Sequence, residues 1–162
     1  MRTRCSQEVP LFSRLLALIF VLPLMADLPS GYKYWNSSRL LDAEKALAPK
    51  MNGQKVASER AGTFSNHYAL ILHREASGQA ELHEHQADLM VIQSGAATLV
   101  IGGTILRSHA TTRGEIRGPS IEGGKRQQIA PGDIIHIPSK TPHQILLDPG
   151  QQLNYFTLKV NE

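Results

Sequence analysis

The feature that most constrains the fold is a series of short segments in which hydrophobic and polar residues alternate, separated by glycine and proline. From Val56 onward the chain repeats such segments, with turn residues such as Ser94-Gly95 and Gly102-Gly103 between them. Alternation with a period of two is typical of strands that bury one face. Many short strands at near-even spacing favour an antiparallel sandwich or barrel over a parallel sheet.

The expected elements are one helix followed by strands. Helical spacing of leucine and alanine predicts a helix from Ser37 to Ala48, with Ser38 as its N-cap and Pro49 at its end. We expect this helix to pack outside the barrel. Exposed aromatics at residues 27–36 indicate an extended arm that docks on a neighbouring subunit, covers the barrel end or packs against the domain's own helix. The predicted strands cover residues 63–73, 80–85, 89–93, 97–101, 125–129, 133–137, 143–147 and 153–160.

Residues 105–124 interrupt this regular spacing and contain Glu115 and Arg117. A connection of this length is either a solvated hairpin or a lid in which an arginine grips an acidic substrate. In the predicted strand at residues 63–73, His67 and His73 face away from the apolar side chains, and we expect them at the surface.

The segment from Gly78 to Gly95 carries a cluster of side chains that bind metals. His83 and His85 lie two residues apart, so they share one face if the strand continues through both. Asp88 follows three residues later, and His143 lies far downstream. Imidazoles combined with a carboxylate suit a divalent metal ion such as Mn, Fe, Ni or Zn. Solvated strand histidines are the alternative.

A second segment, Pro131-Gly132-Asp133-Ile134-Ile135-His136-Ile137-Pro138, runs on to Pro142-His143. Together the two segments resemble the motifs of the cupin superfamily, roughly G-x5-H-x-H-x3,4-E-x6-G and G-x5-P-x-G-x2-H-x3-N. Gly132, Pro138 and His143 match the second motif in identity and spacing, and Asp88 fills the Glu position of the first, six residues before Gly95. The resemblance covers roughly residues 63–160. It implies an all-β fold, an antiparallel double-stranded β-helix or jelly-roll barrel with one N-terminal helix.

The resemblance also implies a metal site, which this sequence alters. Only two residues separate His85 from Asp88, where the family has three or four. Counting back from Asp88, His83 takes the place of the second motif histidine and Glu81 that of the first. A local deletion would instead let His83 and His85 both serve. The implied ligands are therefore His83, Asp88 and His143, with His85 or Glu81 as a fourth. The alternative is a degenerate site whose polar residues only hydrogen-bond.

Charge and the first residues bear on location and partners. The formal charge is +3, but three arginines against one glutamate place +2 of it before residue 26. The nearly neutral remainder offers no electrostatic footprint for nucleic acid. The first 26 residues resemble a cleaved export signal: a basic leader is followed by an apolar stretch at residues 15–24, and cleavage is expected after Ala26. An uncleaved anchor is the alternative. The single cysteine, Cys5, would leave with this signal.

The sequence thus predicts three parts: a signal peptide at residues 1–26, an N-terminal arm and helix at 27–55, and a cupin β-barrel at 56–162. We expect an exported, periplasmic or secreted protein that binds a divalent metal and a small polar molecule, with no membrane contact after cleavage. Cupins include oxygenases and isomerases as well as non-catalytic ligand-binding modules, so both classes stay open. The resemblance makes a homodimer the default.

Overall fold

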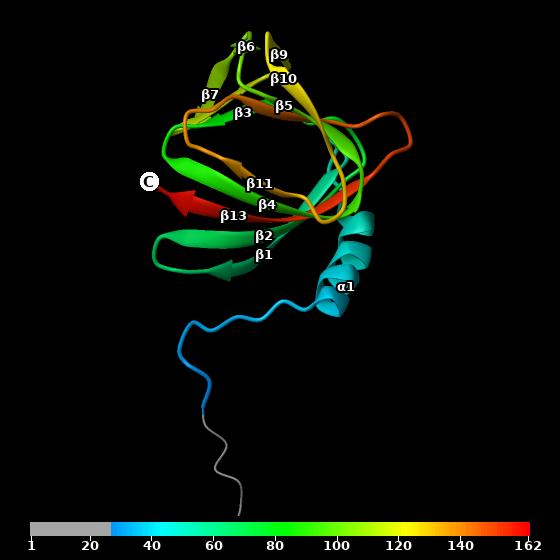
Figure 1. Ribbon diagram of the computed structural model, residues 1–162, viewed down its shortest axis with the longest axis vertical. Coiled ribbons are helices and arrows are strands. Elements are labelled where there is room, and N and C mark those ends of the chain that lie inside the picture. The colour runs from blue at the N-terminus through cyan, green and yellow to red at the C-terminus, as the bar shows by residue number, and fades with distance from the viewer. Residues whose placement is uncertain (1–26) are drawn as a thin grey trace, which may run out of the picture. The chain divides into compact units, whose positions relative to one another are not determined.

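The computed structural model describes residues 27–162 in two units. The first, Met1–Tyr32, is described from residue 27 and contains a turn in which the Tyr32 amide donates to the Pro29 carbonyl at 3.0 Å. The second, Lys33–Glu162, contains every described helix and strand (Figure 1). The expected export signal lies outside the described residues. Within residues 27–162, no helix combines the length and the apolar character needed to cross a bilayer.

Two antiparallel sheets curl around a common interior, as expected for a jelly-roll barrel (Figure 1). The first sheet has the order β1 (Val56–Thr63), β2 (His67–Arg74), β13 (Leu153–Asn161), β4 (Gln86–Gly95), β11 (Ile134–Ile137). The second has the order β10 (Lys125–Ile129), β5 (Ala97–Ile101), β12 (His143–Leu146), β3 (Ala80–His83), β8 (Glu115–Gly118), β7 (His109–Thr112). A separate hairpin pairs β6 (Thr104–Leu106) with β9 (Ser120–Glu122).

The helix α1 (Ser37–Leu47) lies on the outer face of the first sheet and is followed by a 3-10 turn, η1 (Ala48–Lys50). Its N-cap is Asn36 rather than the expected Ser38, because Asn36 has extended backbone and its Oδ1 accepts from the Arg39 amide at 2.9 Å. Leu47 packs with Ile71 and other residues of β1, β2 and β13 in a small apolar cluster under the helix. The helix therefore packs outside the barrel, as predicted.

The outer face of this sheet also accounts for the aromatic residues before the helix. The Trp35 ring lies 5.0 Å from that of Phe156 and 6.4 Å from that of Phe64, centroid to centroid. Trp35 thus packs within its own domain, but on Phe64 and on Phe156 of β13 rather than against the helix that the third alternative named. His73, expected at the surface, is instead buried at 2% exposure, and its Nδ1 lies 2.7 Å from Asn154 Oδ1. The prediction is wrong because helix α1 covers this outer face of β2, where Ile71 packs against Leu47.

The interior changes from apolar to charged along the strands. On β13 every second side chain faces inward, and polarity increases along the strand in the order Leu153, Tyr155, Thr157 and Lys159. The apolar end is closed by a core cluster that includes Ile92, Leu153 and other buried residues of both sheets. The charged end remains open as a cavity of about 520 Å³. This gradient places polar side chains at one end of the barrel.

Residues 105–124 form ordered strands rather than a loop. Within them, β8 pairs with β3 and so extends the second sheet. The register sets Glu115 opposite His83 and Arg117 opposite Glu81. The segment is thus a hairpin, as one of the two alternatives had it, and it brings two charged side chains to the cavity wall.

Candidate metal centre

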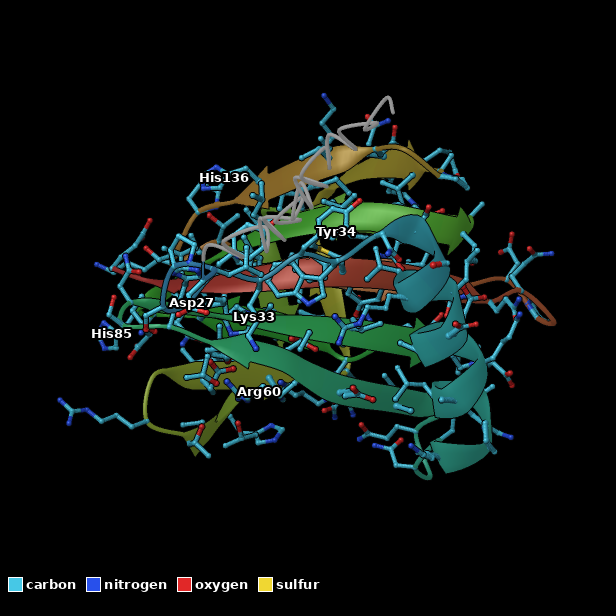
Figure 2. The ribbon with its side chains drawn as sticks, turned by 90° about the horizontal axis from the view of Figure 1, so that it is seen from below. Asp27, Lys33, Tyr34, Arg60, His85 and His136 are labelled. Carbon is cyan, nitrogen blue, oxygen red and sulfur yellow. The ribbon has the colours of Figure 1, made fainter. Side chains whose placement is uncertain are left out.

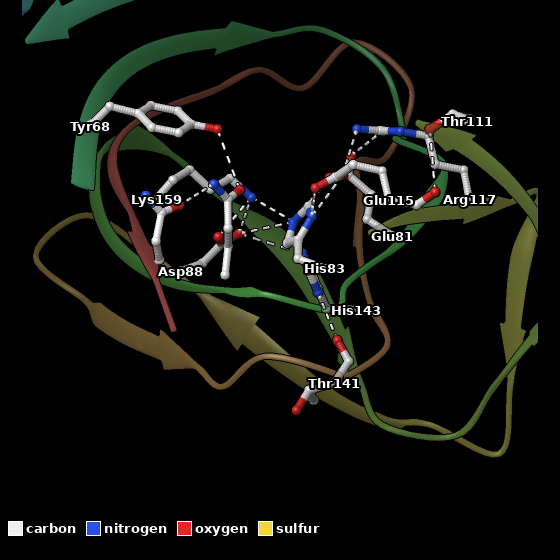
Figure 3. A network of polar contacts seen from close by, with 12 residues as sticks. Tyr68, Glu81, His83, Asp88, Thr111, Glu115, Arg117, Thr141, His143 and Lys159 are labelled. Carbon is white, nitrogen blue, oxygen red and sulfur yellow. Dashed lines mark hydrogen bonds and ion pairs between the residues drawn. The ribbon is translucent and has the colours of Figure 1, made fainter. Parts of the chain in front are cut away.

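Three strands place four polar side chains at the charged end of the cavity. Glu81 and His83 come from β3, where their spacing of two turns both toward the interior. Asp88 comes from β4 and His143 from the start of β12. Three ligand atoms, one each from Glu81, His83 and His143, lie within 4.8 Å of one another. Figure 3 shows these residues together with the neighbours that contact them.

Asp88 joins this group through one carboxylate oxygen. Its Oδ2 lies 3.5 Å from His83 Nε2 and 3.6 Å from His143 Nε2. The second oxygen of Glu81 lies 3.7 Å from His83 Nε2. Metal–ligand bonds of about 2.1 Å place neighbouring ligand atoms about 3.0–3.5 Å apart. The three separations of 3.5–3.7 Å lie at or just above that range, whereas the ligand atoms of Glu81, His83 and His143 are spread over as much as 4.8 Å. The donor atoms can therefore hold a divalent metal only if the side chains move closer together.

Both imidazoles present the same nitrogen to the cluster. His83 Nδ1 donates to Glu115, whose carboxylate oxygens lie 2.8 and 2.9 Å away, and His143 Nδ1 donates to the Thr141 carbonyl at 3.0 Å (Figure 3). A proton held on Nδ1 leaves the lone pair on Nε2, the atom that faces Asp88 in both residues. Outer partners of this kind orient histidines that bind metals.

A lysine already supplies one positive charge to the site. Lys159 Nζ, on β13, lies 2.7 Å from each carboxylate oxygen of Asp88 and donates to His83 Nε2. On the other side of His83, Arg117 Nη1 donates to Glu81 Oε1 at 2.8 Å. The ammonium occupies the neighbourhood in which a metal bound to Asp88 and His83 would lie. Metal binding therefore requires Lys159 to move.

Burial and charge shift the acid–base equilibria of the cluster. Burial raises the pKa of Glu81, but the positive charge of Arg117 outweighs it together with the other cations, so this pKa lies below its ordinary value. Burial likewise opposes the ionised form of Asp88, yet its bond to His83 and the charge of Lys159 keep its pKa low. Both carboxylates are therefore ionised at neutral pH, as ligands must be.

The two histidines shift in opposite directions. Burial lowers the pKa of His143 below its ordinary value, so this ring is neutral at neutral pH and its Nε2 lone pair is available. Burial also acts to lower the pKa of His83, but the hydrogen bond with Asp88 and the nearby carboxylates outweigh it and raise the pKa overall. Without a metal, His83 therefore competes with Lys159 for the negative charge of Asp88.

The structure does not place His85 with this cluster. Strand β3 ends at His83, and the chain bends at residues 84 and 85, so alternation no longer turns His85 inward. Its side chain is 63% exposed and points away from the barrel (Figure 2). Of the two alternatives for a fourth ligand, Glu81 is the residue that lies beside His83. His136, on β11, is also exposed and outside the site.

Three residues of the site were not among the expected ligands. Glu115 and Arg117 were noted only as members of the long connection, and Lys159 belongs to no motif. Strand alternation places Lys159 on the face of Thr157 and Tyr155, which is the one signal in the sequence that could have indicated it. The pairing of β8 with β3 leaves no comparable local pattern.

Comparisons with known proteins bear on the fold. No protein-family model and no curated protein sequence matches the chain. Among solved structures, the protein TT1209 from Thermus thermophilus is similar with a TM-score of 0.52 and 13% identity, over 72% of this chain and 92% of that one. A cupin-2 domain protein from Rhodospirillum rubrum has a TM-score of 0.50 and 14% identity, over 67% and 62%. The polyketide cyclase RemF from Streptomyces resistomycificus has a TM-score of 0.49 and 15% identity, over 67% of each chain.

Proposed function

Because the chain has the cupin fold, we propose that it binds a divalent transition metal through Glu81, His83, Asp88 and His143, with a small polar molecule beside it in the cavity. One observation carries the proposal. The two Nε2 atoms face the same carboxylate oxygen at 3.5 and 3.6 Å, while each Nδ1 is held by an outer acceptor. Residues that served only to fill the barrel would not need both rings fixed in this tautomer.

The types of ligand atom limit which metals this site could bind and what chemistry they could supply. Two imidazoles and two carboxylates suit Mn, Fe, Ni or Zn. When bound, such a metal can polarise a carbonyl group or, if it is iron, bind O2. Around it, Glu115 would hold the His83 ring, Arg117 would hold Glu81, and Lys159 would be released to donate a hydrogen bond to the ligand. An oxygenase or isomerase reaction is the catalytic form of this proposal.

A non-catalytic ligand-binding module is the second candidate, and the position of Lys159 favours it. The ammonium contacts both oxygens of Asp88 and one nitrogen of His83, as a bound cation would. In this case Lys159 permanently replaces the metal, and the cavity binds a polar molecule by hydrogen bonds alone. The two candidates differ in whether a divalent ion can displace the ammonium.

Element analysis of the purified protein separates them. We expect about one equivalent of a transition metal in the wild-type chain, and loss of that metal in His83→Ala and in His143→Ala. The matched control is His85→Ala, which removes an exposed imidazole two residues away and should keep the metal. Wild-type protein that stays metal-free after dialysis against Mn, Fe, Ni and Zn salts would favour the ligand-binding module. Metal retained in both alanine variants would remove the proposed site.

The proposal also covers the cellular location of the protein and its oligomeric state. We propose export through the segment at residues 1–26, followed by cleavage, and assembly as a homodimer. The basic leader and apolar stretch of the sequence support export. Mass spectrometry of the protein recovered from the periplasm or the medium would show a mature chain starting near residue 27 if the proposal holds. Sedimentation at several concentrations would separate dimer from monomer.

A further inference from the structure

A second polar group lies in the same cavity, away from the candidate metal ligands. Arg74, the last residue of β2, lines the cavity and is only 7% exposed. Among residues 27–162, no carboxylate lies within 4.0 Å of its guanidinium nitrogens. Its Nε atom is buried and has no hydrogen-bond partner. A buried cation of this kind is costly unless something neutralises it.

The residues around Arg74 line the same cavity and do not neutralise its charge. Gly78 lies against the guanidinium, and a Cβ at this position would be 2.5 Å from Nη1. Tyr155 lines the same cavity, and burial raises the pKa of its phenol, so the phenol stays neutral and does not balance the charge of Arg74. Next along β13, the Thr157 hydroxyl lines the cavity, is buried and lacks a partner. A donor and a hydroxyl are thus both unsatisfied inside one cavity.

The other cations of the cavity differ from Arg74 in this respect. Arg117 is paired with Glu81 and Lys159 with Asp88, each at 2.7–2.8 Å. Among the described residues, Arg74 is therefore the one cation of this cavity lining that no carboxylate contacts, because Glu115, the third carboxylate of the lining, lies beside His83 and Arg117. A carboxylate from outside the chain would supply the missing partner. A guanidinium offers parallel N–H groups that match the two oxygens of a carboxylate.

We propose that Arg74, with Tyr155 and Thr157, forms an anion subsite that holds the carboxylate of a small organic acid. Gly78, which contacts Arg74, lies three residues before Glu81, and three residues of extended chain cover at most about 10 Å. An acid of a few carbon atoms would therefore reach from Arg74 toward the His83 end of the cavity, whose volume is about 520 Å³. This inference deepens the proposed function by naming its ligand class, and only the position of the acid's far end rests on that proposal.

The test measures binding of succinate by calorimetry to the full chain, freed of metal with EDTA so that the subsite is examined without the metal site. Succinamide, which has the same length and no charge, and inorganic phosphate are the comparison probes. Arg74→Gln removes the cation. Arg60→Gln is the control because Arg60 is an exposed arginine that does not itself line the cavity, although its guanidinium stacks on the lining residue Tyr68. Thr157→Val removes the unsatisfied hydroxyl without changing the side-chain shape.

We expect wild-type protein and Arg60→Gln to bind succinate at least tenfold more tightly than succinamide, with Arg74→Gln losing that preference. Thr157→Val should weaken succinate binding several-fold while leaving thermal stability unchanged or higher. This variant therefore tests the subsite even if Arg74→Gln fails to fold. Equal affinity for acid and amide in wild-type protein, or full succinate affinity in Arg74→Gln, would overturn the proposal. So would tighter binding of phosphate than of succinate. Metal content is measured separately, so the metal site can fail while this subsite stands.

Discussion

Replacing Lys159 by methionine tests how the cavity balances its charges. Lys159 Nζ lies 2.7 Å from both oxygens of Asp88, and the two side chains are 12% and 6% exposed. Methionine keeps much of the length of the lysine side chain and removes the ammonium. In metal-free protein the Asp88 carboxylate then remains buried beside His83 without its main cation, which should destabilise the folded state.

The structure sets the expected size of this loss. Removing one partner of a buried ion pair costs about 3–5 kcal/mol, and the lower figure of about 3 kcal/mol applies here because the pair borders an open cavity. For a domain of this size, 1 kcal/mol shifts Tm by about 3–6 °C, so metal-free Lys159→Met should melt about 10–15 °C below wild type.

Added metal should reverse this effect, because a divalent ion at His83 and Asp88 replaces the missing positive charge. A ligand at 100 times its Kd stabilises by about 2.7 kcal/mol. In wild-type protein the ion must also displace the ammonium, so the rise in Tm with metal should be larger in Lys159→Met.

The assay is scanning calorimetry of EDTA-treated protein with and without excess Mn or Zn salt. Lys125→Met, at an exposed position of β10, is the control and should behave as wild type. A metal-free Tm for Lys159→Met within about 2–3 °C of wild type would show that Asp88 does not depend on Lys159 for its charge balance. A rise in Tm with metal no larger than in wild type would refute the competition between ammonium and metal.

Three further outcomes follow from the site and its scaffold. The lowered pKa values of Asp88 and His143 contribute stability that is lost as pH falls, whereas the raised pKa of His83 contributes stability that is lost as pH rises. Metal-free protein should therefore be most stable against urea at about pH 6.5. Asp88→Asn should flatten the acid side of this stability profile. A profile that keeps rising to about pH 9 would contradict this. Glu115→Gln should keep the fold but weaken metal affinity about ten- to a hundredfold in competition titrations, because Glu115 fixes the His83 ring. Unchanged affinity would show that this contact does not orient the ring. Gly95→Ala should lower the free energy of unfolding by more than about 3 kcal/mol, since φ at Gly95 is +79° and the new Cβ would lie 1.9 Å from a backbone oxygen. A loss under about 1 kcal/mol would contradict the described turn.

Much of the barrel could be predicted from local pattern. The strands at 97–101 and 125–129 have the expected bounds, and the segment ending at His143 folds as a proline corner followed by a strand. These elements carry their own signals, namely alternating side chains and turn residues at their ends. The helix was also expected, although its N-cap is Asn36 instead of Ser38, because Asn36 offers the better-placed oxygen.

The site was harder to predict because it depends on register and pairing. Whether Glu81 or His85 accompanies His83 is decided by where β3 ends, and strand ends have weak local signals. His73 was expected at the surface because its strand gives no hint of the helix that covers it. The partners of His83 come from β8 and β13, which are more than 30 and more than 70 residues away in the sequence. No spacing rule connects such distant positions without the fold.

The proposed metal lies between His83 and His143, with Asp88 and Glu81 as its carboxylate ligands. Its position can be measured by anomalous diffraction from crystals of metal-loaded protein, recorded at the absorption edge of the bound metal. We expect one strong peak within about 2.0–2.2 Å of both Nε2 atoms, with Lys159 Nζ moved away from Asp88. A cavity without a peak and with the ammonium still on Asp88, or a peak at exposed His85 alone, would contradict the proposed position.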